Sequence, residues 1–370
     1  MTAQRDIETA TTTDGWKLRL YHYPPKILTP NRPPVIVCHG LAANKNSCDF
    51  GGPDTPVWHR YSLAAYLTNT NPAFDVWVPE LRGNGTSTYD PHEHPEKFRW
   101  SVDDYITKDV PAIIKRVQTW HHDHHGQTPQ VFWVGKSMGG MIAYAYGETP
   151  AGRASLKGVV TLGSPVVFGH TSLLLEFLTR VTPRNLSMPL RLPELVIKSQ
   201  ELRHHFTTMG VNSDNIDPTI WDQYLLTGHQ DVLSSKVMSH FSLFFRHTTF
   251  CRYPRHPWIY DTVGRLPWFN KLIAPYSYTD HLSRFTAPLL AIAGGQDRLA
   301  PPTDVQYAAS HVGSTDVTYL ECSKKNGFTA DYGHLDLNLG LHARDEIYPR
   351  IADWLQARST TSTGTAGGGT

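Results

Sequence analysis

One serine, placed between an apolar run and a helix-forming segment, constrains the fold more than any other feature. The four residues before its turn are apolar, and the turn itself, residues 135–139, has the pattern G-x-S-x-G. A side chain at the tip of so tight a turn needs neighbours without a Cβ atom. Gly135 and Gly139 supply them, and Gly140 lets the following helix approach the strand. The pattern predicts a strand, a strained turn that presents Ser137, and a helix whose N-terminus favours a negative charge.

The same residues offer one rival interpretation. Gly135-Lys136-Ser137 matches the end of the phosphate-binding pattern G-x-x-x-x-G-K-[ST]. That pattern needs a glycine five residues before Gly135, and the chain has Gln130 there, inside the predicted strand. No residues remain to form a loop around a phosphate, so nucleotide binding is rejected.

Short apolar runs, separated by segments of helix length, predict a mostly parallel sheet between layers of helices. Continuous apolar runs, in place of alternating ones, are typical of strands covered on both faces. Before these runs, two segments over residues 7–12 and 17–22 flank Asp14-Gly15, which is a strong hairpin signal. Helices are expected over residues 105–120, despite Pro111, and over 344–355 at the end. Eight strands are expected, over residues 7–12, 17–22, 35–38, 76–78, 131–134, 159–162, 289–293 and 317–320.

The regular alternation stops at about residue 168, after the sixth strand, and resumes at residue 284. The stretch between is rich in aromatic residues, leucine and proline. It is expected to be a helical cap over the carboxyl edge of the sheet; the alternative is an ordinary helical subdomain with its own core. The expected organisation is a core of residues 1–168 and 284–358 with the cap, residues 169–283, inserted. Residues 359–370 hold no side chain large and apolar enough to pack, so this tail is expected to be disordered.

Two later segments supply the acid and the base that a serine nucleophile needs. The strand at 289–293 runs into a glycine turn that ends in Asp297, and His334 lies on a loop before the closing helix. The order Ser, Asp, His along the chain predicts a triad of Ser137, Asp297 and His334. His334 is one of 20 histidines, so it is its position after Ser137 and Asp297, and not its residue type, that identifies it as the base. For Asp297 the alternative is a loop-capping role, which would also suit Asp304.

Two backbone amides are candidate donors to the oxyanion that such a serine would form. Met138 follows the serine at the N-terminus of the predicted helix. Leu41 follows His39-Gly40 at the end of the first parallel strand, where Gly40 allows the backbone to turn. The alternative for Gly40 is a simple strand-ending glycine.

Bulk composition excludes several classes of partner. The formal net charge is +1 and the charged residues are dispersed, which argues against a nucleic-acid partner. Four cysteines without a C-x-x-C pair are expected to be reduced thiols, with a single bridge as the alternative. The first residues lack the apolar segment of a signal peptide, and no apolar run approaches bilayer length. No stable membrane insertion and a cytoplasmic location are therefore expected, and the oligomeric state is not predicted.

Two polar segments offer further candidates. The histidine-rich residues 121–125 follow a helix and precede Gly126, and a solvated loop is expected there in place of a metal site. Adjacent histidines cannot all face one ion, and neither a metal ion nor a cofactor is expected. Arg82, in a glycine-rich loop after the fourth strand, is expected either to form a buried ion pair or to contact a substrate.

Several segments, in the same order along the chain, resemble the acid lipase family, the α/β-hydrolases that include gastric and lysosomal lipases. The resemblance implies an α/β-hydrolase fold in which Ser137 is the nucleophile, Asp297 the orienting acid and His334 the base. It also implies that Leu41 and Met138 are the oxyanion donors. The similar segments include Asp14-Gly15, His39-Gly40-Leu41, Arg82-Gly83-Asn84, Gly294-Gly295-Gln296-Asp297 and Tyr332-Gly333-His334.

The chain also departs from that family. The family usually has His at the position of Lys136 and Gln at the position of Met138, and its members are typically secreted. The predicted cap shows no match to the family, so the family's substrates are not carried over.

The expected activity is hydrolysis of a small hydrophobic carboxylic ester through an acyl-enzyme on Ser137. Acyl transfer, or polyester or lactone processing, on the same triad is the alternative. A non-catalytic ligand-binding relative is the third hypothesis, against which the intact triad argues. Leu174 and Phe177, three residues apart on an expected cap helix, are candidate substrate contacts. The alternative is that both are buried in the core of the cap.

Overall fold

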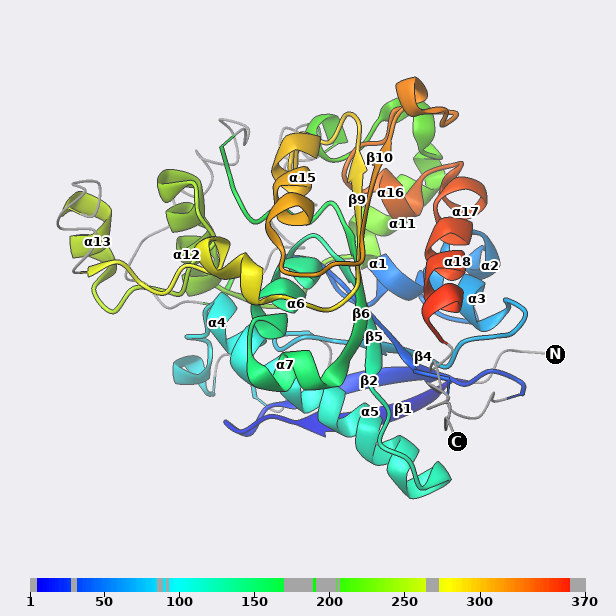
Figure 1. Cartoon of the computed structure of the whole chain (residues 1–370), viewed down its shortest axis with the longest axis horizontal. Coiled ribbons are helices and arrows are strands. Elements are labelled where there is room, and N and C mark those ends of the chain that lie inside the picture. Colours follow the sequence, from blue (N-terminus) through cyan, green and yellow to red (C-terminus); the bar gives the residue numbers. More distant parts are fainter. Residues whose placement is uncertain are drawn as a thin grey trace, which may run out of the picture.

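The computed structural model describes residues 5–27, 32–84, 89–90, 93–169, 189–190, 204, 207–263 and 273–359. Its centre is an eight-stranded sheet with the strand order β1-β2-β4-β3-β5-β6-β9-β10 (Figure 1). β2 is antiparallel to both of its neighbours, and all other neighbouring strands are parallel. The predicted, mostly parallel sheet of eight strands is confirmed. The strands are β1 (Asp6–Thr11), β2 (Lys17–Tyr23), β3 (Val35–Cys38), β4 (Val76–Pro79), β5 (Val131–Lys136), β6 (Leu156–Leu162), β9 (Leu289–Gly294) and β10 (Val317–Cys322).

Each face of the sheet is covered by its own layer of helices, as the continuous apolar runs predicted. In β3, Val35 and Val37 belong to one hydrophobic cluster, while Ile36 and Cys38 belong to the other, because successive side chains of a strand point to opposite faces. Helices α5 (Val110–His125), α6 (Met138–Gly147) and α15 (Pro302–His311) pack on the face of Ile36. The face of Val35 is covered by α1 (Asn46–Asp49), α3 (Leu63–Thr68), α17 (Ala343–Glu346) and α18 (Tyr348–Ser359). Three further short helices are α2 (Trp58–Tyr61), α7 (Pro150–Ser155) and α16 (Asp336–Leu339).

The helix predicted over residues 105–120 is longer than expected. It begins with α4 (Val102–Asp104), passes through a π-helical turn at Tyr105–Asp109 and continues as α5 to His125. Pro111 lies directly after the π-helical turn, where the regular hydrogen-bond pattern of the helix is already interrupted, so a residue without an N–H is tolerated there. Gly126, with a φ of 68°, ends the helix. The loop predicted for residues 121–125 is therefore wrong.

Side-chain contacts explain why the histidines continue the helix. His121 Nε2 lies 2.8 Å from Asp75 Oδ2, and His22 Nε2 lies 2.6 Å from the other oxygen of the same carboxylate. Burial alone would raise the pKa of Asp75, but its hydrogen bonds with His121 and His22 hold it well below the usual range. The ring of His124 stacks on Trp120 at 4.2 Å. These contacts outweigh the weak helix propensity of histidine.

Between β6 and β9 the chain leaves the sheet, and we call residues 163–288 the inserted segment. Its described residues form mainly helices: α11 (Pro218–Thr227), α12 (Ser235–His247) and α13 (Pro257–Val263). α12 and α13 extend from the sheet on the left of Figure 1. Asp217 caps α11 by accepting a hydrogen bond from Thr219 N at 2.8 Å. β7 (Pro189–Leu190) and β8 (Leu233–Ser234) form a small antiparallel pair.

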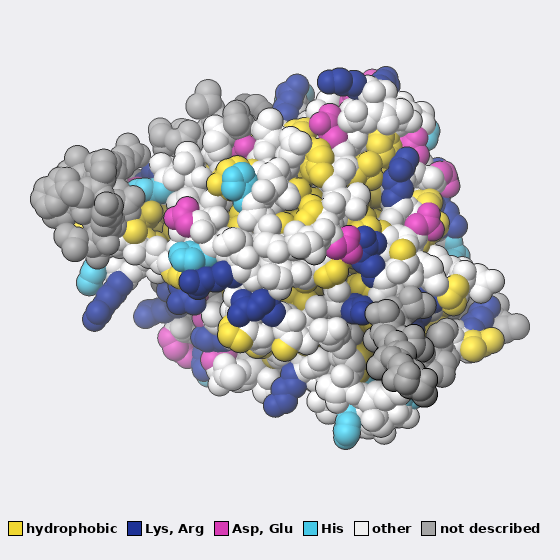
Figure 2. Space-filling model, viewed as in Figure 1, with side chains coloured by type: hydrophobic (Ala, Val, Ile, Leu, Met, Phe, Trp, Pro, Cys, Tyr) yellow, Lys and Arg dark blue, Asp and Glu magenta, His cyan; other side chains and the backbone are white. Residues whose placement is uncertain are grey.

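The described surface carries both signs of charge. On the face shown in Figure 2, basic and acidic side chains are scattered over the molecule, in keeping with a net charge of +1. Within the described part of the chain, no helix is both long and apolar enough to cross a membrane. All four cysteines are buried and unbridged. α18 ends at Ser359, and the rest of the tail predicted to be disordered lies outside the described residues.

Candidate active site

Ser137 occupies the strained turn between β5 and α6. Its φ of 53° and ψ of −121° are unusual for a residue with a side chain. The predicted roles of the glycines follow from the geometry: a Cβ at Gly135 would lie 2.4 Å from the backbone of Gly139. A Cβ at Gly140 would lie 2.3 Å from Ser164 Oγ. Ser137 N donates to Leu162 O at 2.8 Å, which fixes the turn against the neighbouring strand.

The predicted base and acid are in contact. His334 Nδ1 lies 2.7 Å from Asp297 Oδ2. The other oxygen of Asp297 accepts hydrogen bonds from Leu299 N at 2.9 Å and Ala300 N at 2.8 Å, so the carboxylate is held in one orientation. Asp297 is 3% exposed. Asp304, the competing acid, lies in the first turn of α15.

One glycine makes room for this pair. Gly163, directly after β6, has a φ of 57°. A Cβ there would lie 3.0 Å from both Asp297 Oδ2 and His334 Nδ1. A residue with a side chain would therefore strain the backbone and crowd the contact between acid and base.

Ser137 and His334 line one pocket. The Asp297 contact uses Nδ1 of the imidazole, so Nε2 is the nitrogen left to exchange a proton with a serine. The Ser137 hydroxyl makes no hydrogen bond to the described residues. In structures without substrate such hydrogen bonds are often long, and they tighten when the substrate binds. The geometry brings the three predicted residues to one site, at the carboxyl ends of β5, β9 and β10.

The two predicted oxyanion donors flank Ser137. Met138 is the first residue of α6, where N–H groups have no intrahelical partner. The loop of Leu41 runs close to the serine, since a Cβ at Gly40 would lie 3.0 Å from Ser137 Cβ. Both amides belong to segments whose free N–H groups could stabilise an anion beside Ser137.

His39 orients this loop, a role that sequence reasoning missed. Leu81 N donates to His39 Nε2 at 3.2 Å, so Nε2 is the acceptor and the proton is on Nδ1. His39 Nδ1 can then donate to Gly40 O at 3.0 Å, which turns the N–H of the same peptide, that of Leu41, the other way. Burial lowers the pKa of His39 to about 4, so the ring is neutral at pH 7. The segment His39-Gly40 was visible in the sequence, but the orientation of the ring depends on Leu81, which is 42 residues away.

The pocket is a cavity of about 200 Å³ with a mostly apolar lining. Gly40, Leu41 and Met141 contribute from the core, and Lys136 is the one Lys, Arg, Asp or Glu among the described residues that line it. Leu174 and Phe177, the predicted substrate contacts, lie outside the described residues. The inserted segment contributes large apolar side chains: Phe168, Trp221, Leu225, Met238, Phe241 and Phe245.

Backbone hydrogen bonds join the inserted segment to the loops around the serine. Gln230 N donates to Ala42 O at 2.9 Å, next to Leu41, and Asn44 N donates to Gly228 O at 3.1 Å. Val232 N donates to Gly83 O at 2.9 Å. These bonds tie residues 228–232 to both the loop of Leu41 and the loop after β4.

Of the two roles predicted for Arg82, the structure shows the buried ion pair. Its guanidinium is 1% exposed and binds Asp109 Oδ1 at 2.6 Å and Asp14 Oδ2 at 2.9 Å. These two carboxylates, from the π-helical turn and the first hairpin, hold the loop after β4 in place. Arg82 does not line the pocket of Ser137.

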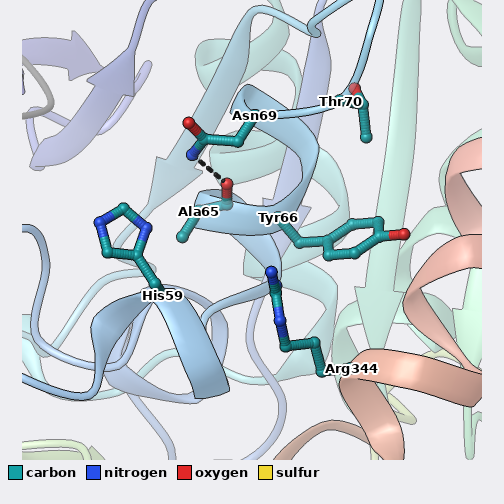
Figure 3. Close-up of a pocket in the computed structure, with 6 residues that line it drawn as sticks. All are labelled: His59, Ala65, Tyr66, Asn69, Thr70 and Arg344. Atoms are coloured by element: carbon teal, nitrogen blue, oxygen red, sulfur yellow. Dashed lines mark hydrogen bonds between the residues drawn. The ribbon is translucent and has the colours of Figure 1, made fainter.

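A second hollow, of about 140 Å³, lies between α2, α3 and α17 (Figure 3). Figure 3 shows His59, Tyr66 and Arg344 around it, with the Arg344 guanidinium 5.2 Å from the centre of the Tyr66 ring. None of Ser137, Asp297 and His334 lines it. Among the described residues, no group of three His, Cys, Asp or Glu side chains is placed to hold a metal ion.

Comparison with known proteins bears on the same part of the chain. Residues 33–337 match a family model described as alpha/beta hydrolase fold. The chain is 21% identical over 348 residues to triacylglycerol lipase 2 of Arabidopsis thaliana, covering 89% of this chain and 77% of that protein. It is 24% identical over 367 residues to the gastric triacylglycerol lipase of Mus musculus, covering 92% and 85%. A solved esterase from Thermogutta terrifontis is similar in fold, with a TM-score of 0.57 at 17% identity, covering 97% of this chain and 100% of that one.

Proposed function

Because this chain belongs to the alpha/beta hydrolase fold family and has lipases among its relatives, we propose that it hydrolyses carboxylic esters with Ser137, His334 and Asp297. The observation that carries the proposal is the 2.7 Å contact between His334 and a buried Asp297, in the same site as a strained serine. A serine alone is a weak nucleophile and needs a base held in the correct tautomer.

The proposed reaction has two halves. Ser137 Oγ attacks the ester carbonyl while His334 Nε2 takes its proton, and the alcohol leaves with that proton. Water, activated by the same nitrogen, then releases the acid from the acyl-serine. Asp297 keeps the Nδ1 proton in place and stabilises the imidazolium without itself being protonated. The N–H groups of Leu41 and Met138 stabilise the oxyanion in both halves.

The proposed substrate is an ester with an apolar acyl group. The lining of the pocket supports this, because a polar or charged acyl chain would lose its hydration there without gaining partners. The relatives named as triacylglycerol lipases support the same class. We further propose that the inserted segment selects the acyl chain, since it supplies most of the large apolar side chains.

A panel of p-nitrophenyl esters of graded chain length, assayed with and without added alcohol, tests the activity. Ser137→Ala should lower kcat by about 10⁴-fold or more, and a fluorophosphonate should label Ser137 in the parent. Ser310→Ala, on the exposed side of α15, is the matched control and should be fully active. Normal turnover by Ser137→Ala would contradict the proposal. Products that contain the added alcohol, formed in place of free acid, would indicate acyl transfer.

The identity of the acid is tested separately. Asp297→Asn should impair turnover, whereas Asp304→Asn should not. The reverse result would show that the acid is Asp304.

A further inference from the structure

Lys136, the residue before Ser137, is a buried lysine without a carboxylate partner among the described residues. It is the last residue of β5 and is 6% exposed. Among the described residues, no carboxylate forms a salt bridge with its ammonium group. Lysine is almost never fully buried unless it is paired, so this position calls for an explanation.

Its hydrogen bonds lead to the loop that carries His334. Nζ donates to the side-chain oxygen of Asn338 and approaches Leu335 O at 3.5 Å. Asn338 Nδ2 donates to Ser47 O on α1. An ammonium group can only donate and a carbonyl oxygen can only accept, so the two contacts fix which way the amide of Asn338 points. Tyr348 Oη donates to Asn338 O at 2.6 Å, which holds the same residue from α18.

The loop is held from its other side by the inserted segment. Leu335 N donates to Gly210 O at 2.7 Å. Asp336 accepts from Asn215 Nδ2 at 2.9 Å and from Gly333 N at 3.0 Å. Residues 333–338 are therefore held between the inserted segment and the strand that carries the serine. Lys136 is the contact on the serine side.

The charges near Lys136 point to the same loop. The charged groups that act on its ammonium are the carboxylates of Asp336 on α16 and Asp297 after β9, and the Cys48 thiol on α1 lies beside it. Burial lowers the pKa of Lys136 to about 8, so the ammonium form predominates at pH 7. Burial also raises the pKa of the Cys48 thiol to about 12, so that group is neutral.

We propose that Lys136 is a positioning residue: by binding Asn338 and the Leu335 carbonyl, its ammonium sets the place of His334 relative to Ser137. The proposal rests on the proposed function, because it assigns His334 the role of base. It gives a role to a buried cation whose hydrogen bonds go to Asn338 and Leu335 O and not to Ser137 or His334. An error of about 1 Å in the position of a catalytic group can cost about 100-fold in rate.

The rate at which a fluorophosphonate labels Ser137 is the main readout, because it reports activation of the serine and needs no knowledge of the substrate. Lys136→Met keeps the length of the side chain and removes its donors. It should label about 10- to 100-fold more slowly than the parent, and kcat for esters should fall by a similar factor with KM changed less than about threefold. Lys157→Met, the same change at the start of β6, is the matched control and should behave as the parent.

Chemical rescue separates positioning from a structural role. Lys136→Ala leaves a space that matches the three carbons and the ammonium group it has lost. Added n-propylammonium should therefore raise the labelling rate of this variant at least about tenfold. Tetramethylammonium, a cation without N–H donors, should not. Labelling is preferred to turnover here because amines also compete with water for an acyl-enzyme. Asn338→Leu, which removes the acceptor, should slow labelling to a similar extent.

Failure of the proposed function and failure of the positioning role give different results in these experiments. A parent that labels at Ser137 but hydrolyses no ester contradicts the proposed function and leaves the role of Lys136 testable by labelling. Labelling of Lys136→Met at the parent's rate overturns the positioning role. Slow labelling with a lowered melting temperature and no rescue by n-propylammonium also overturns it, because the lysine would then serve the fold alone.

Discussion

Replacing Lys136 by methionine should change the pH dependence of stability by an amount that the structure sets. Burial lowers the pKa of Lys136 from 10.5 to about 8. The folded protein therefore releases this proton near pH 8, whereas the unfolded chain holds it until about pH 10.5. Between these values the unfolded state binds more protons, so the free energy of unfolding of the parent rises with pH. The slope is about 1.4 kcal/mol per pH unit, or about 3 kcal/mol over the whole interval.

Urea denaturation of the parent and of Lys136→Met, from about pH 7 to about pH 10.5, measures this term. Most other titrations are shared by both proteins and cancel in the difference. Relative to the variant, the parent should be least stable below about pH 8 and should gain about 3 kcal/mol by about pH 10.5. The difference between the parent and Lys157→Met should stay flat. Parallel curves for the parent and Lys136→Met would refute the reasoning, because the ammonium would then be hydrated or paired.

Three further predictions concern the site itself. Gly163→Ala should lower kcat by about tenfold or more and the free energy of unfolding by about 1–2 kcal/mol, because a Cβ at its φ of 57° strains the backbone and crowds the contact between His334 and Asp297. Ester kinetics and urea denaturation measure the two effects, and unchanged kinetics would contradict this. His334→Ala should lower kcat by about 10⁴-fold or more, and Asp297→Asn should retain more activity because the acid only orients and stabilises the base; equal losses in steady-state assays would contradict that division of roles. Phe241→Ala should shift kcat/KM toward longer acyl chains by about 1–3 kcal/mol, whereas Phe328→Ala, buried on the other face of the sheet and outside the pocket, should not. Equal ratios in both variants would remove the inserted segment from acyl selection.

The parts of the molecule that depend on local patterns could be predicted from the sequence. The inner strands β3, β4, β5, β6 and β9 are short, mostly apolar and buried on both faces, so the continuous runs around residues such as Ile36 and Trp133 predict them. The contact between His334 and Asp297 could also be predicted, because parallel strands bring their carboxyl ends to one edge of the sheet. Their order in the chain then sets which side chains meet.

The parts of the molecule that depend on contacts between distant residues could not be predicted from the sequence. Residues 121–125 have the composition of a loop, and only the buried carboxylate of Asp75 shows why His121 stays helical. Lys136 is separated from Asn338 by 202 residues, so no spacing in the chain connects them. The side chains of the inserted segment that reach the pocket, such as Trp221, depend on how its helices fold back over the sheet.

The hydrogen bonds from residues 228–232 to the loops beside Ser137 matter for any exchange of the inserted segment between relatives. A chimaera that replaces residues 163–288 as a block removes the bond from Gln230 N to Ala42 O, next to the Leu41 amide. It also removes the bond from Val232 N to Gly83 O. Such a graft would alter the rate of the chemical step together with the choice of substrate. A transplant that keeps Gly163, residues 210–215 and residues 228–232 from this chain, and exchanges the remaining helices, separates the two effects, because Gly163, Gly210 and Asn215 hold the loop of His334.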